Sequence, residues 1–273
     1  MQGKIMTKKL IDPFLKWAGG KRWLVKNYNH LFPTHFERYI EPFLGSGSVF
    51  FYLQPDKAIL ADSNASLIEA YQAIKDDWRR VRKELVNHHR LHSKTHYYRV
   101  RSATFRSPFT RAAQFIYLNR TCWNGLYRVN LKGEFNVPIG TKQDVIMESD
   151  DFEGVARALQ GAKVLHSDFE SIIARAKKGD LVFVDPPYTV QHNLNNFIKY
   201  NERLFHWNDQ IRLRNCVIRA KARGAQIIVS NAYHKSVRVL YGAFGELHRV
   251  KRHSILAADS ARRKVCEELI VII

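Results

Sequence analysis

The sequence has 273 residues, with 44 Lys and Arg against 25 Asp and Glu, which gives a formal net charge of +19. This length suits one large domain or a domain with a sizeable insertion. The charge favours a polyanionic partner, most often nucleic acid, over an anionic membrane surface. No run approaches the ~20 apolar residues of a spanning helix, and the basic start lacks a signal-peptide core. Three widely spaced cysteines indicate neither a zinc site nor a disulfide framework, so we expect a cytoplasmic protein.

Short apolar or β-branched runs that end in a polar or turn residue predict the strands. They lie at residues 38–43, 57–63, 162–168, 180–188 and 225–231. Helical patterns cover 66–85 and 207–224, the latter with Asn208 as its expected N-cap. This alternation predicts a doubly wound, mostly parallel α/β sheet whose ligands bind at the carboxyl ends of the strands. Residues 245–255 and 263–273 would add two final strands, the last one antiparallel.

Two glycine-containing stretches near the start favour a nucleotide-like ligand. In FLKWAGGKRWL (14–24), Lys16, Trp17 and Lys21 surround a Gly-Gly turn that does not match a phosphate loop. In YIEPFLGSGSVFF (39–51), a predicted strand precedes Gly45-Ser46-Gly47, and the third glycine of the dinucleotide fingerprint is absent. The pattern therefore favours S-adenosylmethionine over a pyrophosphate ligand. Asp62 ends the next strand, where a carboxylate can accept from ribose hydroxyls.

The strand pattern stops between residues 66 and 151. Residues 79–132 contain thirteen Lys and Arg but a single acid, Glu84, and many aromatics. We interpret 66–151 as an inserted, mainly helical, basic DNA-recognition domain, and 1–65 with 152–273 as the catalytic domain. The histidines in NHHRLHSKTHYY (87–98) have helical spacing without a nearby acid, so we expect them on a solvated or phosphate-facing helix face rather than around a metal.

The stretch LVFVDPPYTV (181–190) combines a buried strand with a carboxylate, two prolines and a tyrosine. Because prolines carry no N–H, the turn offers hydrogen-bond acceptors, which match the two donors of an amino group on a planar ring. Asp185 and the Pro186 carbonyl can accept from an adenine or cytosine amine, while Tyr188 stacks on a base flipped out of the duplex. This pattern leaves adenine N6, cytosine N4 and a non-catalytic DNA-binding regulator as alternatives.

Five stretches, in this order, resemble the Dam-type DNA adenine-N6 methyltransferases of the D12 class, alpha group: FLKWAGGK, IEPFLGSGSVFF, LADSNASLIEAYQAIK, FIYLNRTCWNGLYRVNLKGEFNVPIG and VDPPY. The resemblance covers nearly the whole chain and implies the Rossmann-like fold of S-adenosylmethionine-dependent methyltransferases. Three parts of the chain depart from the family pattern: the segment after DPPY, the tail at 253–269, and the neighbours of Arg128, with Cys122-Trp123 before it and Tyr127 beside it.

The resemblance also implies the site residues. Catalysis on a flipped adenine falls to Asp185, Pro186, Pro187 and Tyr188. S-adenosylmethionine binding falls to Trp17, Ala18, Lys21, Glu41, Phe43, Gly45, Ser46, Gly47, Asp62, Asp168, Phe169 and Asp185. DNA binding falls to Lys16, Arg120, Trp123, Asn124, Leu126, Arg128, Asn130 and Pro138.

Within the recognition segment, the resemblance places Arg128 on a guanine, and a guanidinium fork also suits guanine O6 and N7. GATC is the expected target and duplex DNA the expected partner. No metal and no membrane are expected. A monomer or weak dimer is expected, with a cognate restriction nuclease as a further partner that the resemblance leaves open.

Overall fold

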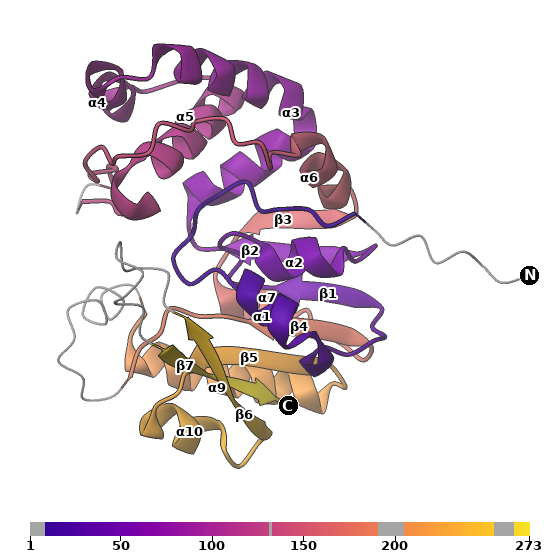
Figure 1. The fold of residues 1–273 in the computed structure, drawn as a ribbon. Coiled ribbons are helices and arrows are strands. Elements are labelled where there is room, and N and C mark those ends of the chain that lie inside the picture. Colours follow the sequence, from indigo (N-terminus) through magenta and orange to yellow (C-terminus); the bar gives the residue numbers. More distant parts are fainter. Residues whose placement is uncertain (1–8, 131–132, 191–204, 254–264) are drawn as a thin grey trace, which may run out of the picture. The chain divides into compact units, whose positions relative to one another are not determined.

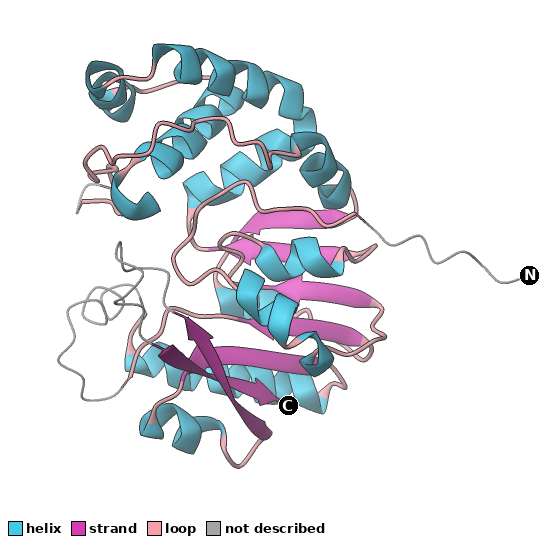
Figure 2. Ribbon diagram, viewed as in Figure 1, coloured by secondary structure: helices cyan, strands magenta, loops and turns pink. Residues whose placement is uncertain are grey.

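The structure is a computed structural model that describes residues 9–130, 133–190, 205–253 and 265–273. Its chain divides into two compact units. Unit 1 consists of Met1–Lys26, Gly45–Asp56 and Asn64–Val164, and unit 2 consists of Asn27–Leu44, Lys57–Ser63 and Leu165–Ile273. Unit 1 is dominated by helices, whereas unit 2 contains most of the sheet (Figure 2). Within the described ranges, no helix is long and apolar enough to cross a membrane.

The described strands form one seven-stranded sheet in the order β3-β2-β1-β4-β5-β7-β6 (Figure 1). The strands are β1 Arg38–Glu41, β2 Ala58–Asp62, β3 Ala162–His166, β4 Asp180–Val184, β5 Gln226–Ala232, β6 Glu246–His253 and β7 Val265–Ile272. β1 pairs in parallel with β2 and β4, and β4 pairs in parallel with β5. β7 is antiparallel to both β5 and β6. Each strand expected from the sequence is present, and the expected antiparallel last strand is confirmed.

Parallel pairing brings several strand ends to one edge of the sheet. Tyr39 aligns with Ala58 and with Leu181, so β1, β2 and β4 all end toward this edge. Every residue of β4 is buried, and Val182 and Val184 join a core that also contains Ile40 and Val229. Burial of such side chains contributes roughly 1.5–3 kcal/mol each, so the strand that leads into Asp185 is firmly held.

The helices of unit 2 include η1 Asn29–Leu31, α7 Phe169–Ile173, α9 Trp207–Ala222 and α10 Lys235–Tyr241. The expected cap of the long helix is corrected, because α9 begins at Trp207 with His206 as its N-cap. The His206 backbone N–H donates to Asp209 Oδ2 at 2.9 Å, which closes the first turn without Asn208.

Unit 1 is built around the long helix α3. Its elements are α2 Ser48–Leu53, α3 Ala65–Leu91, α4 Lys94–Ser102, α5 Pro108–Thr121, η2 Trp123–Gly125 and α6 Phe152–Leu159. Helix α1, Arg22–Asn27, also belongs to unit 1 except for its last residue, because the first segment of unit 1 ends at Lys26. α3 packs against α5 and α6. It bends at Asp77, whose φ of −154° and ψ of 84° are not helical. Asp77 Oδ1 accepts from the Arg79 and Arg80 N–H groups and so caps the second part of α3.

The histidines of α3 and α4 lie in a different environment from the one expected. His88 and His96 are buried, and their rings share a hydrogen bond of 3.0 Å between Nδ1 and Nε2. His88 stacks on Tyr117 of α5, and His92 Nδ1 lies 2.9 Å from the Tyr117 hydroxyl. The expectation of a solvated or phosphate-facing cluster is therefore wrong for His88 and His96. His88 of α3 and His96 of α4 are core residues of unit 1, because both rings pack on Tyr117 of α5.

Candidate active site and DNA-recognition segment

The DPPY turn follows β4 and is anchored through the tyrosine hydroxyl. Tyr188 donates to Glu268 Oε2 at 2.6 Å and lies 2.9 Å from Ser230 Oγ. Ser230 and Glu268 are buried on β5 and β7. Burial and the negative charges of Asp185 and Glu268 raise the pKa of Tyr188 well above its ordinary value, so the phenol stays protonated.

The backbone of the same turn is held by polar side chains of unit 2. Gln210 of α9 is buried and donates from Nε2 to the Pro187 carbonyl at 3.4 Å. Asn231 of β5 orients Gln210 by donating to its Oε1 at 3.0 Å. Thr189 donates to the Phe205 carbonyl at 2.6 Å. The two prolines restrict the φ angles of the turn, and these hydrogen bonds hold the Pro187 carbonyl and the Thr189 side chain that follow Asp185.

Two carboxylates lie at neighbouring strand ends of unit 2. Glu41 ends β1 and is buried, and Asp185 follows β4, the parallel neighbour of β1. Burial together with the charges of Glu41 and Asp185 raises the pKa of Tyr39 well above its ordinary value. Both carboxylates therefore act on the same buried region. Their negative field suits a positively charged ligand group, such as an ammonium or sulfonium.

An aromatic pair in unit 2 comes from the segments that follow β1 and β3. Phe43 stacks on Phe169 with ring centroids 5.4 Å apart. Asp168 caps α7 by accepting from the Glu170 N–H at 2.9 Å, and Arg212 binds both Asp168 oxygens at 3.1 Å. Arg212 also lies over the Phe169 ring. Asp62 ends β2, and its carbonyl accepts from the Ser167 N–H at 3.2 Å.

The glycine turn of unit 1 packs directly on a tryptophan. Gly45 and Gly47 have φ values of 47° and 64°, which side chains rarely adopt. A Cβ on Gly45 would lie 2.8 Å from Trp17 Cδ1, so only glycine permits this contact. Ser46 Oγ lies 2.9 Å from Ser48 Oγ, and the Lys21 ammonium is buried against the Gly19 carbonyl at 2.6 Å.

The residues expected to bind S-adenosylmethionine thus divide between the units. Unit 1 contributes Trp17, the exposed Ala18, Lys21, Gly45, Ser46 and Gly47, and unit 2 contributes Glu41, Phe43, Asp62, Asp168, Phe169 and Asp185. Unit 1 supplies a side-chain-free backbone turn beside an indole ring, and unit 2 supplies carboxylates and a stacked aromatic pair.

The recognition segment after α5 doubles back on itself. The Asn136 N–H donates to the Arg128 carbonyl at 3.1 Å, and the Asn130 N–H donates to the Glu134 carbonyl at 2.9 Å. The Trp123 N–H donates to the Pro138 carbonyl at 2.9 Å. Gly140 closes the ribbon, since its N–H donates to Thr121 and a Cβ there would lie 2.6 Å from the Cys122 carbonyl oxygen. This close approach explains the need for glycine after the NVPI run.

This ribbon exposes several of the residues expected to bind DNA. Trp123 is 53% exposed, and Asn124, Arg128 and Pro138 are also exposed. Arg128 Nε donates to Asn136 Oδ1 at 2.9 Å, which leaves the two terminal nitrogens of the guanidinium fork outside this bond. Asn130 and Leu126 are half-buried, and Asn130 bonds to Glu134 through both ends of its amide.

Lys16 is tied to the recognition segment through Asn119 of α5. The Lys16 N–H donates to Asn119 Oδ1 at 2.9 Å, and Asn119 Nδ2 donates to the Lys16 carbonyl at 2.7 Å. Gly125 lies against Lys16, because a Cβ there would meet Lys16 Cβ at 3.0 Å. Burial, followed by the charges of Lys142 and Arg120, lowers the pKa of Lys16.

Arg120 is placed differently from the other residues expected on DNA. It is fully buried, forms an ion pair with Asp150, and donates to the carbonyls of Phe14 and Val145. Its guanidinium is therefore saturated inside unit 1. In this structure Arg120 holds three chain segments together, and the expectation that it contacts DNA is corrected.

Several residues that shape the site were not identified from the sequence. Ser230, Asn231, Gln210 and Glu268 support the DPPY turn, and Asn119 supports Lys16. The SN pair at the end of β5 is a detectable signal, because polar residues there lie at the ligand edge of a parallel sheet. Glu268 lies in the terminal run 263–273, which was predicted only as a final antiparallel strand.

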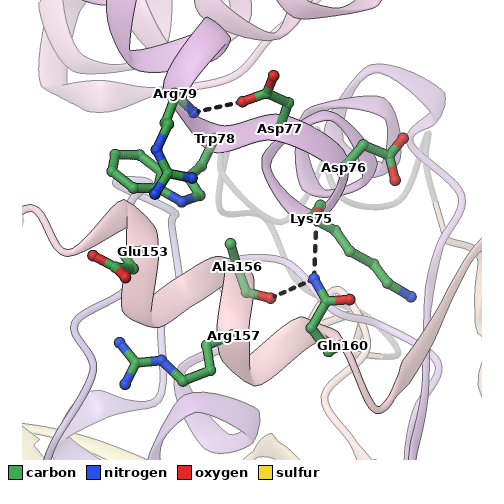
Figure 3. A pocket seen from close by; sticks show the side chains of 9 residues that line it. All are labelled: Lys75, Asp76, Asp77, Trp78, Arg79, Glu153, Ala156, Arg157 and Gln160. Atoms are coloured by element: carbon green, nitrogen blue, oxygen red, sulfur yellow. Dashed lines mark hydrogen bonds between the residues drawn. The ribbon is translucent and has the colours of Figure 1, made fainter.

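A separate cavity lies in unit 1, where α3 bends beside α6. It has a volume of about 510 Å³ and is lined by Lys75, Asp76, Asp77, Trp78, Arg79, Glu153, Ala156, Arg157 and Gln160. Figure 3 shows that Gln160 bridges the carbonyls of Lys75 and Ala156 across its floor. None of the expected site residues lines it. Among the described residues, no group of three or more His, Cys, Asp or Glu could hold a metal ion.

The sheet order and the DPPY turn define a doubly wound α/β fold of the S-adenosylmethionine-dependent methyltransferase type. Residues 17–255 match the D12 class N6 adenine-specific DNA methyltransferase family, and the chain belongs to this family. The activity of the family is methylation of adenine in DNA, and both family and fold imply S-adenosylmethionine as the methyl donor.

Relatives over nearly the full length agree with this assignment. The chain is 35% identical to the Type II methyltransferase M1.LlaDCHI of Lactococcus lactis subsp. cremoris, covering 96% of this chain and 95% of that protein. It is 34% identical to the Type II methyltransferase M.MjaIII of Methanocaldococcus jannaschii, covering 96% and 98%. It is 32% identical to the DNA adenine methylase of Escherichia coli K12, covering 95% and 94%.

Proposed function

We propose that this protein transfers a methyl group from S-adenosylmethionine to N6 of an adenine flipped out of duplex DNA, with GATC as its target. The anchored DPPY turn carries this proposal. Its Tyr188 hydroxyl and Pro187 carbonyl are bonded within the protein and hold the turn in place. We assign the Asp185 carboxylate and the Pro186 carbonyl to the adenine amine because both are acceptors and the amine has two donors. The ring face of Tyr188 would stack on the extruded base.

The residues of the turn would supply orientation and charge complementarity. S-adenosylmethionine, when bound, supplies a methyl group on an activated sulfonium. Asp185 and the Pro186 carbonyl would accept both amino hydrogens, which favours rehybridisation of a nitrogen whose lone pair is delocalised into the ring. Asp185 also balances the positive charge that develops on that nitrogen. No general base with a tuned pKa is required, because the proton can leave after transfer.

The cofactor assignment follows the chemistry of each unit. Glu41 and Asp185 suit the cationic part of the cofactor, and Asp62 suits its ribose hydroxyls. The Phe43–Phe169 pair suits an adenine ring, with Asp168 next to it. The Gly45–Gly47 turn with Trp17, Ala18, Ser46 and Lys21, all in unit 1, is assigned to the same cofactor because its glycines let a ligand approach the backbone.

We assign DNA recognition to residues 66–151 together with Lys16, and catalysis to 1–65 and 152–273. Arg128 would bind guanine O6 and N7 through its terminal nitrogens, while Trp123, exposed on the same ribbon, would fill the gap left by the flipped base. Lys16, Asn124, Leu126, Asn130 and Pro138 would complete the interface. A pI near 10 supports phosphate attraction without sequence preference.

The test is transfer of labelled methyl from S-adenosylmethionine to unmethylated duplex DNA, followed by nucleoside analysis and mapping of the modified sites. N6-methyladenine at GATC would support the whole proposal. N6-methyladenine at another defined site would retain the reaction and reject the target. A protein that binds both DNA and S-adenosylmethionine but incorporates no methyl would contradict the proposed activity and favour a regulator.

A further inference from the structure

The hydroxyl of Tyr188 is held inside the protein by two neighbouring strands of the sheet. Glu268 Oε2 accepts from it at 2.6 Å, and Ser230 Oγ lies 2.9 Å away. Ser230 is fully buried and Glu268 is 2% exposed. In the antiparallel register, Ala232 pairs with Glu268 and Ser230 pairs with Ile270, which makes Ser230 and Glu268 diagonal neighbours on one face of the sheet.

A second strand neighbour stabilises the charge of Glu268. Arg252 of β6 forms an ion pair with Glu268, with Nε and Oε1 2.5 Å apart. The Glu268 carboxylate thus bridges a guanidinium and a phenol, one through each oxygen. A charged acceptor makes a shorter and stronger bond to a hydroxyl than a neutral one does.

Both ends of the Tyr188 side chain are consequently fixed. The Pro187 carbonyl, next to its backbone, is bonded to Gln210, and the hydroxyl is bonded to Glu268. The phenol oxygen lies on the axis of the Cβ–Cγ bond, so its position fixes χ1 but not the rotation of the ring about that axis. Because a phenolic O–H lies in the plane of its ring, the bond that it donates to Glu268 restricts this rotation as well. Stacking requires that a base meet this plane at a defined distance and tilt.

We propose that Glu268 is a positioning residue that acts through Tyr188: it locks the plane of the ring against which the flipped base stacks. This inference rests on the proposed function, because it assigns a role to Tyr188 in methyl transfer. Glu268 itself does not touch substrate. Arg252 keeps its carboxylate in place, and Ser230 supports the same hydroxyl from β5.

A mutant cycle separates this role from simple support of the β6–β7 pair. The variants are Glu268→Gln, Tyr188→Phe and the double variant. Glu267→Gln is the matched control, because Glu267 precedes Glu268 on β7, points to the opposite face of the strand and pairs with Arg249. The readouts are kcat and KM for transfer to a duplex, and the melting temperature of each variant.

We expect Tyr188→Phe and Glu268→Gln each to lower kcat by roughly 5- to 20-fold, because residues that share one hydrogen bond are strongly coupled. KM for S-adenosylmethionine should change little. In the Tyr188→Phe background, Glu268→Gln should cause no further loss of kcat, and Glu267→Gln should retain the wild-type kcat. Equal fold losses from Glu268→Gln in both backgrounds would overturn the inference, since a purely structural defect does not depend on the Tyr188 hydroxyl.

A second variant keeps the test decisive if Glu268→Gln does not fold. Ser230→Ala removes the other partner of the hydroxyl without leaving an unpaired charge, and its effect on kcat should also vanish in the Tyr188→Phe background. A Ser230→Ala loss that persists there would count against the inference. If the wild type methylates no adenine, the proposed function fails; if an active wild type gives additive variants, the role of Glu268 alone fails.

Discussion

Solvent exposure distinguishes the roles of two arginines in unit 1, Arg120 and Arg128. Arg120 is fully buried on Asp150 and two carbonyls, whereas Arg128 is exposed on the recognition ribbon. Both lie in one segment that resembles a DNA-binding motif. Only the surroundings of each guanidinium separate a residue that stabilises the fold from one that is available to DNA.

We expect Arg120→Met to lower the free energy of unfolding by roughly 3–5 kcal/mol, because it leaves the buried Asp150 carboxylate without its cation. Arg128→Met is the matched control and should leave stability within about 0.5 kcal/mol, since its side chain is exposed. Denaturant unfolding measures both. Equal stability for Arg120→Met and the wild type would show that the buried ion pair contributes nothing.

The same pair of variants separates stability from recognition. Arg128→Met should reduce discrimination at one base pair of the target by roughly 1–3 kcal/mol, measured by binding to duplexes that differ at that pair. A uniform loss of affinity on all duplexes would instead identify Arg128 as a phosphate contact.

At the scale of elements, the histidines that join α3, α4 and α5 predict a pH-dependent stability. Burial lowers the pKa of His88 to about 4, and also lowers the pKa values of His92 and His96. Because the folded-state pKa lies below the unfolded value near 6.5, the unfolded chain binds protons first as the pH falls. Stability is therefore fully present above pH 6.5 and declines between about 6.5 and 4.

The expected decline is roughly 2 kcal/mol between pH 7.5 and pH 5 from His88 alone, given ~1.4 kcal/mol per pH unit. Urea unfolding at the two pH values measures it. Replacing His88 by Gln should flatten this dependence, whereas the exposed neighbour His89→Gln serves as a control that keeps it. A wild-type stability that rises on acidification would contradict the assignment.

A second element-scale prediction concerns the stack between Trp17 and Tyr127. Their rings are 5.7 Å apart and 24° from parallel, and Trp17 also packs on Gly45. Tyr127 adjoins Arg128, so one aromatic contact joins the segment assigned to the cofactor with the segment assigned to DNA. We expect the two ligands to bind cooperatively, with a coupling of roughly 1–3 kcal/mol that Tyr127→Ala reduces and Tyr127→Phe retains.

This coupling is measured as the affinity for S-adenosylhomocysteine with and without duplex DNA, in the wild type and both variants. The ratio of the two affinities should fall several-fold in Tyr127→Ala alone. An unchanged ratio would limit Tyr127 to a packing role.

The elements also show how far a sequence can be interpreted. The strands were predictable because their apolar runs and polar ends follow from burial in a parallel sheet, and the DPPY turn was predictable because its residue types restrict its chemistry. Helical spacing predicted that His88, His92 and His96 share one helix face, but His88 lies on α3, His92 caps that helix and His96 lies on α4. Spacing alone could not identify Tyr117 as their common neighbour. Likewise, the partners of Arg120 lie 106 and 30 positions away, at Phe14 and Asp150, where only the fold connects them.

For the whole molecule, we expect the large positive charge to govern the affinity for DNA without governing the rate of methyl transfer. Exposed cations on α3, including Arg79, Arg80, Arg82 and Lys83, add phosphate attraction that does not depend on the reacting base. The affinity for DNA should therefore fall steeply with salt for any duplex. Methyl transfer should instead depend on a few residues at the carboxyl ends of the strands.

Asp185→Ala tests this separation directly. The variant should lose at least about 100-fold in methyl transfer, because the carboxylate that balances charge on the amine is gone. Its affinity for DNA at a fixed salt concentration should stay equal or rise slightly, since the change removes a negative charge from a protein of net charge +19. Glu246→Ala, which removes an exposed carboxylate at the start of β6, makes the same change in charge and should leave transfer intact. If Asp185→Ala instead lost transfer and DNA affinity in the same proportion, Asp185 would act in DNA binding and its assignment to the chemistry would be wrong.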